Sequence, residues 1–141
     1  MILLASRCGL RRAEVAQVHS RDVEEDLLGW SLRVHGKGRR QRRVPLPDEV
    51  RFALRRRGEG WAFPGPRGHL SPVRVGELVS EALPEGWTMH TLRHRYATRC
   101  YAGSRDLLAV STLLGHTRPE TTRVYIGLSN DALRSAAQWA A

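Results

Sequence analysis

Residues 88–125 constrain the fold most, because the boundary signals of three successive helices fall within this one stretch. A threonine cap and Gly103 bound a first predicted helix, and Ser104 and a glycine bound a second over 104–115. A capping-box pattern opens a third helix at 117–120. The pattern predicts three short helices separated by tight joints.

The first of these helices combines an apolar stripe with polar residues along its edge. At about 100° per residue, the stripe contains Met89, Leu92, Tyr96 and Cys100. His90 and Arg93 fall at the margin of that stripe, where packing can hold a side chain that still reaches a ligand. His116 lies in the joint after the second helix, and Tyr125 comes nine residues later. Helix caps say nothing about chemistry, so periodicity alone favours a plain helical subdomain.

The remaining pattern predicts an α+β fold that is mainly α-helical, with one small β-hairpin. Helices are expected at 1–8, 11–18, 48–57, 71–83 and 129–141. Strands at 30–35 and 41–46 pair through a turn that carries Lys37 at its tip. A loop at 59–70 joins the helix at 48–57 to the helix at 71–83, and its Trp61 and Phe63 are expected to pack on the core.

The charge indicates a polyanionic partner, most often a nucleic acid. The chain has a formal net charge of +9, with a sequence pI near 11.1. The predicted hairpin contains no acid and forms an exposed cationic finger whose arginines contact phosphates or are simply solvated: Arg33, Arg39, Arg40, Arg42 and Arg43. Arg95 and Arg99 are further phosphate-facing or solvated candidates.

Length and composition favour a single domain, 1–141, in a reducing compartment. Cys8 and Cys100 are too few for a disulfide framework or a metal site, which favours a cytoplasmic protein. We expect no membrane association, because no apolar run has the length of a membrane span. The sequence has no cluster of carboxylates for two hard cations, so a metal-dependent nuclease is the least favoured class.

Four segments together resemble the catalytic domain of tyrosine recombinases, the phage-integrase and Xer-type family. They are CGLRRAEV, VHGKGRRQRRVPL, HTLRHRYAT and LLGHTRPETTRVY, and the resemblance extends from about Leu4 to Leu128. It implies the recombinase catalytic-domain fold and six catalytic positions: Arg11, Lys37, His90, Arg93, His116 and Tyr125. Glu14 matches the family's GLRxxE pattern and is expected to support the site without reacting.

The resemblance also assigns a role to each position. Arg11 and Arg93 would clamp the scissile phosphate, because guanidinium groups offer paired donors to its oxygens. Tyr125 would be the nucleophile. A tyrosine with a pKa of about 10 is only about one part in a thousand ionised at pH 7, so it needs cationic surroundings or a base.

Three further residues would move or donate protons. His90 is the candidate base and His116 the candidate donor to the phosphate, although these two tasks could be exchanged. Lys37 would act as general acid for the leaving 5′ oxygen. The product is a 3′-phosphotyrosine link that retains the bond energy, so no metal, ATP or other cofactor is expected.

Partners and alternatives follow from the same comparison. Family members act as tetramers on two DNA duplexes and commonly pass a C-terminal segment to a neighbour, for which Ser129 to Ala141 is the candidate; without DNA a monomer is expected. The family's N-terminal core-binding domain is expected to be absent, and the apolar start of the chain suggests a truncated catalytic domain. The alternatives are a non-catalytic helix-turn-helix module at 104–125 and a type IB topoisomerase.

Overall fold

The computed structural model describes residues 1–36, 38 and 40–116. The predicted third helix of the 88–125 stretch, Tyr125 and the predicted helix at 129–141 lie outside the described residues, as do Lys37 and Arg39. The described helices are α1 (Ile2–Cys8), α2 (Arg12–Ala16), the short 3₁₀ helix η1 (Ser20–Asp22), α3 (Asp48–Arg55), α4 (Pro72–Glu81), α5 (Met89–Ser104) and α6 (Leu107–Leu114). The strands are β1 (Val23–Asp26), β2 (Gly29–His35), β3 (Gln41–Pro45), β4 (Pro64–Gly65) and β5 (Gly68–His69).

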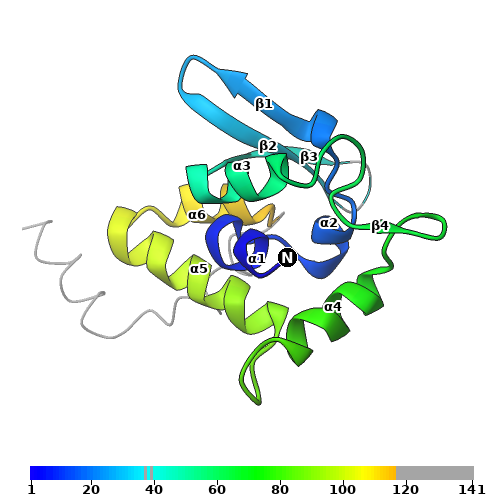
Figure 1. Ribbon diagram of the computed structural model, residues 1–141. Helices are drawn as coiled ribbons and strands as arrows, with labels where there is room; N and C mark the ends of the chain where they lie inside the picture. Colours follow the sequence, from blue (N-terminus) through cyan, green and yellow to red (C-terminus); the bar gives the residue numbers. More distant parts are fainter. Residues whose placement is uncertain (37, 39, 117–141) are drawn as a thin grey trace, which may run out of the picture.

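Helix α1 lies at the centre of the described part of the molecule (Figure 1). Helix α5 packs along it, α2 packs on α4, and the sheet with α3 covers the opposite side. The core draws on all of these elements, with Leu4, Val15, Leu32, Val44, Val75 and Leu92 each at most 5% exposed. The expected fold class, helix-rich with a small sheet, is confirmed.

The sheet is larger than the predicted hairpin. Strands β2 and β3 pair antiparallel as expected, with Leu32 opposite Val44, but β1 adds a third strand on the other edge of β2. The sequence of β1, VEED, has a single apolar residue, so alternation does not reveal it. The hairpin itself contains no acid, but β1 brings one beside it, since Glu24 pairs with Arg33 at 2.9 Å and with Arg43 at 3.1 Å.

The joint between α5 and α6 differs from the prediction. The Thr88 cap is confirmed, since its hydroxyl accepts a hydrogen bond from the backbone of Thr91. Gly103, expected to end the helix, and Ser104, expected to open the next, both lie inside α5. The helix ends instead at Arg105, in the left-handed region with φ of 55°, and Asp106 caps α6 through a 2.9 Å bond from the backbone of Ala109. The cap of α6 is thus Asp106, two residues after the predicted Ser104, and α5 continues past Gly103.

Gly9 brings α1 and α5 close together. It ends α1 in the left-handed region, with φ of 65°, and a Cβ atom at this position would lie 2.7 Å from Cε1 of Tyr96 and 3.2 Å from Leu114. Only glycine combines this backbone conformation with this approach. The predicted end of the first helix is therefore confirmed, and the contact sets the spacing between α1, α5 and α6.

The other predicted elements are confirmed with small changes. Helix α2 ends at Ala16 and α3 at Arg55, each two residues earlier than expected. The loop at 59–70 contains the two-residue strands β4 and β5, with Phe63 buried and Trp61 half-buried between the rings of His19 and His69. Within the described ranges, every helix is too short or too polar to span a lipid bilayer.

Candidate active site

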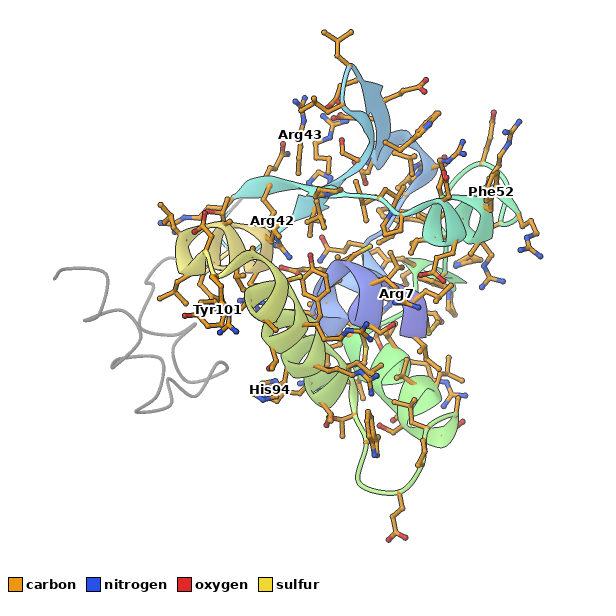
Figure 2. All side chains as sticks on the ribbon, turned by 90° about the vertical axis from the view of Figure 1, so that its left-hand side faces the viewer. Arg7, Arg42, Arg43, Phe52, His94 and Tyr101 are labelled. Carbon is orange, nitrogen blue, oxygen red and sulfur yellow. The ribbon has the colours of Figure 1, made fainter. Side chains whose placement is uncertain are left out.

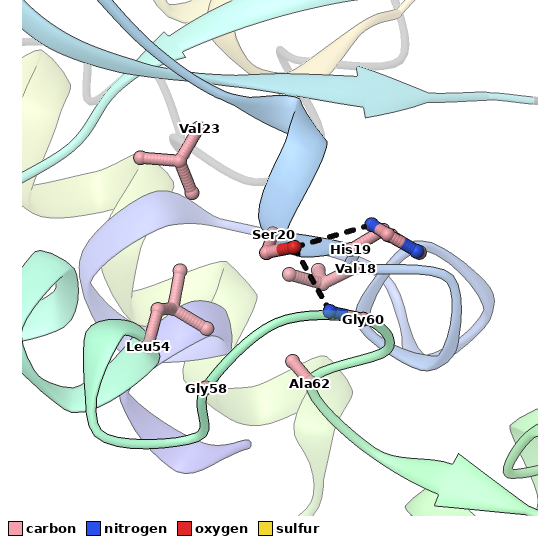
Figure 3. Close-up of a pocket in the computed structure, with 8 residues that line it drawn as sticks. All are labelled: Val18, His19, Ser20, Val23, Leu54, Gly58, Gly60 and Ala62. Carbon is pink, nitrogen blue, oxygen red and sulfur yellow. Dashed lines mark hydrogen bonds between the residues drawn. The ribbon is translucent and has the colours of Figure 1, made fainter.

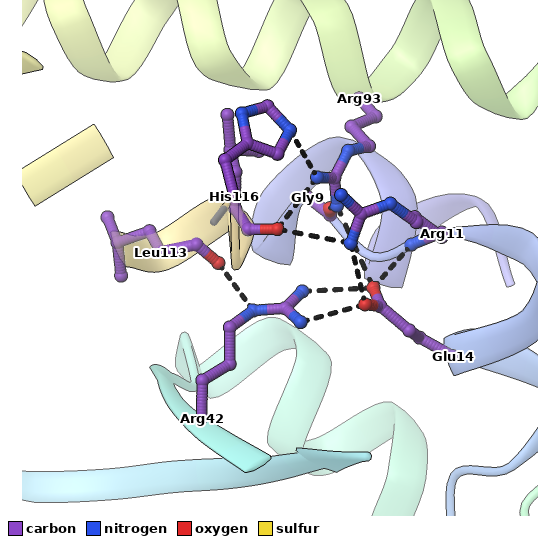
Figure 4. A network of polar contacts seen from close by, with 8 residues as sticks. Gly9, Arg11, Glu14, Arg42, Arg93, Leu113 and His116 are labelled. Atoms are coloured by element: carbon purple, nitrogen blue, oxygen red, sulfur yellow. Dashed lines mark hydrogen bonds and ion pairs between the residues drawn. The ribbon is translucent and has the colours of Figure 1, made fainter. Parts of the chain in front are cut away.

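A buried carboxylate, that of Glu14, organises the candidate site (Figure 4). Its side chain is 3% exposed and accepts hydrogen bonds from the backbone N–H of Arg11 at 2.8 Å and from Nη1 of Arg11 at 3.0 Å. Nη1 and Nη2 of Arg42 donate to its two oxygens at 2.8 and 2.9 Å. Burial works to raise the pKa of Glu14, but the hydrogen bonds and charges of Arg42 and Arg11 outweigh it and lower that pKa. Glu14 is therefore ionised at neutral pH.

The C-terminal end of α6 receives three arginine side chains from the described residues. Arg42 donates from Nε to the carbonyl of Leu113 at 2.7 Å. The carbonyl of Leu114 accepts from Arg11 at 3.3 Å and from Nη2 of Arg93 at 2.7 Å. The last carbonyls of a helix carry partial negative charge and lack partners within the helix. The N-cap of α2, strand β3 and helix α5 thus each supply a cation to this helix end.

Arg93 crosses from α5 to the end of α1. Its side chain is 3% exposed, with Nη1 donating to the carbonyl of Gly9 and lying 3.7 Å from Oε2 of Glu14. The close approach of α5 to α1 at Gly9 brings Arg93 within reach of this carbonyl. Arg93 therefore has its position set by backbone atoms of two helices.

His116 follows the glycine that ends α6, and its ring lies beside Arg93. Its backbone N–H donates to Ser111, and its Nε2 is 3.1 Å from Nη2 of Arg93. A guanidinium group can only donate, so Nε2 accepts and the ring proton of neutral His116 is on Nδ1. Burial, followed by the charges of Arg93 and the other two arginines, lowers the pKa of His116 to about 4. The ring is therefore neutral at pH 7 and can donate from Nδ1.

Arg11 is the outward-facing arginine of this cluster. Its side chain is 43% exposed, compared with 11% for Arg42 and 3% for Arg93. In the described part of the chain, Nε and Nη2 of Arg11 donate to no protein atom. These two donors match the spacing of two oxygens of a phosphate. The cluster can therefore bind an anion through Arg11 while Glu14 holds the side chain in place.

The structure brings three of the six predicted catalytic residues together: Arg11, Arg93 and His116. His90 is exposed on the first turn of α5, one turn before Arg93. Lys37 and Tyr125 lie outside the described residues.

The hairpin arginines do not form a single exposed group. Arg42 and Arg43 point to opposite faces of β3 (Figure 2), with Arg43 69% exposed. The expectation that Arg42 is exposed is wrong, because Glu14 and the end of α6 take up its guanidinium group. Arg40 is exposed, and Arg33 is paired with acids at its side.

Two other basic candidates lie on α5. Arg95 and Arg99 are exposed and, by helical geometry, face away from the buried Arg93. They are therefore available to a polyanion but do not belong to the arginine cluster.

The central position of Glu14 and the inward direction of Arg42 were not predicted. A signal for Arg42 exists in the sequence, since it precedes the buried Val44 by two residues and a strand has a period of two. The GLRxxE spacing places Glu14 one turn after Arg11, but it does not reveal that Arg42 and Arg93 converge on the same carboxylate.

A separate cavity lies between η1, α3 and the loop after α3 (Figure 3). It is lined by Val18, His19, Ser20, Val23, Leu54, Gly58, Gly60 and Ala62 and has a volume of about 10 Å³. That is room for about one water molecule. None of its lining residues belongs to the arginine cluster, which remains the candidate site.

Comparisons with known proteins show which family this chain resembles. The model of the phage integrase family matches residues 73–131. Tyrosine recombinase XerD of Caulobacter vibrioides is 31% identical over 159 residues, covering 98% of this chain and 52% of its own length. Tyrosine recombinase XerC of Chromohalobacter salexigens is 37% identical over 152 residues, covering 96% of this chain and 50% of its own length. The chain spans about half the length of these curated relatives.

The solved structures give the same fold. XerH site-specific recombinase, in a pre-cleavage complex bound to its difH substrate, has a TM-score of 0.72 and 24% identity, covering 96% of this chain and 44% of that chain. The family match and the Xer relatives support a tyrosine recombinase catalytic domain of the phage integrase family. The helix-turn-helix module and the type IB topoisomerase are not favoured by these comparisons.

Proposed function

We propose that this chain is the catalytic domain of a site-specific DNA recombinase or integrase, which cleaves and rejoins DNA strands through a 3′-phosphotyrosine intermediate. The observation that carries the proposal is the meeting of Arg11, Arg93 and His116 around one ionised carboxylate. Arg11 and the Leu114 carbonyl that it shares with Arg93 are 103 residues apart in the sequence. A packing role alone does not require a partly exposed arginine whose Nε and Nη2 donate to no atom of the described residues.

The phosphate would be bound by the arginine cluster. The outward Nε and Nη2 of Arg11 donate to the non-bridging oxygens, which gain negative charge when the phosphorus is attacked. Arg93 adds a second cation beside them, and Nδ1–H of His116 supplies a neutral donor. The low pKa of His116 suits this assignment, because the ring donates without needing an extra proton.

The covalent step would use Tyr125. Its Oη attacks the scissile phosphorus and forms the P–O bond to tyrosine, while the bond from phosphorus to the 5′ oxygen breaks. The phenolic proton passes to His90 as base, and Lys37 donates a proton to the departing 5′ oxygen. Attack by a 5′ hydroxyl reverses these transfers and reseals the same strand or joins another. Neither a metal nor ATP enters this scheme.

The partner would be double-stranded DNA, in keeping with the net charge of +9. Outside the cluster, Arg33, Arg40, Arg43, Arg95 and Arg99 are candidate phosphate contacts, and Arg39 is a further one from the sequence. XerH, which shares the fold, is seen bound to its difH substrate. By family resemblance we expect a tetramer on two duplexes, a monomer without DNA and docking of Ser129 to Ala141 on a neighbour. We propose a cytoplasmic location for a protein that is prokaryotic or phage-encoded, in keeping with the free thiols of Cys8 and Cys100.

The test is incubation with a duplex that carries a 5′-bridging phosphorothiolate, in the presence of a chelator, followed by a denaturing gel. A protein–DNA adduct is expected from the natural chain, and none from Tyr125→Phe at unchanged DNA affinity. A full-length relative of known activity on its own site serves as the positive control for the substrate design.

The other two tyrosines provide matched controls. Burial raises the pKa of Tyr96, which packs against Gly9 and is a poor nucleophile for this reason. Tyr101→Phe makes the same chemical change on α5, and its adduct is expected to match that of the natural chain. An adduct that survives Tyr125→Phe, or salt-sensitive binding without any adduct over a panel of sites, would contradict the proposed chemistry.

A further inference from the structure

Arg42 is held on the inner face of β3 by directed bonds. Its Nη1 and Nη2 donate side by side to the two oxygens of Glu14, at 2.8 and 2.9 Å, and its Nε donates to Leu113 at 2.7 Å. This paired geometry is the strongest that an arginine forms with a carboxylate. With 11% of its side chain exposed, Arg42 offers little surface to a DNA backbone.

The stem of Arg42 also packs against the end of α6. A Cβ atom at Gly115 would lie 2.8 Å from Nη1 and 3.0 Å from Cδ of Arg42. Gly115 stands in the left-handed region, with φ of 63°, directly before His116. The guanidinium group of Arg42 therefore occupies space that any other residue at 115 would need.

The charges of the cluster divide unequally among the three arginines. Arg42 makes two bonds to the carboxylate, whereas Nη1 of Arg93 is 3.7 Å from it and Arg93 bonds instead to carbonyls and to His116. Three guanidinium groups face this one carboxylate, so the cluster keeps a net charge of two positive. Attack on a phosphodiester raises its charge from one negative to two, which this net charge matches.

We infer that Arg42 is a positioning residue for the proposed strand cleavage: its paired bonds to Glu14 offset that carboxylate, so that the cluster keeps two positive charges for the phosphate. The inference rests on the proposed function. Without Arg42, a carboxylate buried to 97% would lose its main partner, and such a group draws the nearest cations to itself. Nη1 of Arg93 is already 3.7 Å from Oε2 of Glu14, and Arg11 is bonded to the same carboxylate, so both can move closer to it.

The first experiment separates cleavage from DNA binding. Arg42→Met is compared with the natural chain in single-turnover cleavage at saturating phosphorothiolate duplex, and in DNA affinity over a series of salt concentrations. We expect the saturated rate to fall about 10- to 100-fold, as for groups displaced by about 1 Å. The slope of affinity against salt is expected to stay unchanged, because Arg42 releases no counterion from a phosphate.

Two further variants distinguish charge balance from simple packing. Glu14→Gln/Arg42→Met removes both buried charges, so it is expected to cleave faster than Arg42→Met, whereas a lost packing contact predicts a double variant that is slower still. Arg42→Lys keeps a positive charge beside Glu14 and is expected to cleave faster than Arg42→Met. If Arg42→Met does not fold, Arg42→Lys takes its place in the first experiment, with a smaller loss of rate and the same salt slope.

Arg51→Met is the matched control. Arg51 is a 20%-exposed arginine on α3 that pairs with Asp48 at 2.8 Å, remote from the cluster. Its loss is expected to lower stability without changing the saturated rate. The inference is overturned if Arg42→Met lowers the salt slope by about one at an unchanged saturated rate, or if the double variant is no faster than Arg42→Met. Failure of the proposed function would look different, because the natural chain would then form no Tyr125-dependent adduct.

Discussion

Replacing Glu14 by glutamine tests the buried carboxylate at the centre of the site. The two side chains have the same shape, but glutamine has one acceptor oxygen and one donor nitrogen. Each carboxylate oxygen of Glu14 accepts two N–H groups, one from Arg11 and one from Arg42. Whichever way the amide turns, its nitrogen faces two donors, so two bonds are lost and the other two become bonds to a neutral acceptor.

The expected loss of stability follows from these bonds. Hydrogen bonds to charged groups contribute about 1.5–3 kcal/mol each, and breaking a buried ion pair costs about 3–5 kcal/mol. We therefore expect Glu14→Gln to lower the free energy of unfolding by about 3–5 kcal/mol at pH 7. This is a large part of the roughly 5–15 kcal/mol typical of a domain. With a urea slope of about 2 kcal/mol per molar, the midpoint would fall by roughly 2 M.

The assay is urea unfolding followed by tryptophan fluorescence, repeated between pH 7 and pH 3. Because the pKa of Glu14 is lowered on folding, its contribution is present above the ordinary value of 4.5 and is lost as pH falls through the native value. The difference between Glu14 and glutamine is therefore expected to shrink at low pH. Glu49→Gln, which breaks the half-exposed pair with Arg7, is the control and is expected to cost about 0.5 kcal/mol or less. A loss below about 1 kcal/mol for Glu14→Gln at pH 7 would refute the reasoning.

Three other predictions test the frame of the site and its electrostatics. Gly9→Ala is expected to cost about 3 kcal/mol or more in thermal unfolding, because strain is added to a clash with Tyr96; Gly58→Ala, with positive φ but open space, is expected to cost about 1–2 kcal/mol. Stability is expected to fall as pH drops from 6.5 towards 4, because the unfolded chain protonates His116 while the folded chain keeps it neutral; His116→Gln is expected to remove this part of the pH dependence. Arg40→Gln is expected to weaken DNA binding and to lower the salt slope by about one, whereas an unchanged slope would exclude a phosphate contact.

Local signals in the sequence predicted most of the helices, because caps and glycine stops act within a few residues. The Thr88 cap and the Gly115 stop appear where their side-chain chemistry predicts. The end of α5 was not predicted correctly. Gly103 and Asp106 are both boundary signals, and only the packing of the structure decides between them. Strand β1 was not predicted for a related reason. It forms by pairing with β2, and the sequence pattern does not show that arginines of the neighbouring strand stabilise its acids.

Three of the six residues that the motifs select lie together in the structure, but the network that holds them was not predictable from the motifs. The family motifs selected Arg11, Arg93 and His116, and the structure joins them. The motifs do not specify that one carboxylate serves arginines from three elements. This depends on how β3 lies against α6, a contact between residues 71 apart at its key bond. The same contact leaves the side chain of Arg42, expected at the surface, only 11% exposed.

Most helices leave their last carbonyls to water, whereas arginine side chains donate to those at the end of α6. Its last carbonyls, those of Leu113 and Leu114, are bonded to guanidinium groups, so the final turn opens only when the arginine cluster opens with it. The backbone N–H of His116, bonded to Ser111, belongs to that turn. We therefore expect the hydrogen exchange of this N–H to speed up when the cluster is disrupted, and to change when a phosphate binds the same donors. Hydrogen exchange at the His116 N–H can thus be used to detect whether the site holds a phosphate.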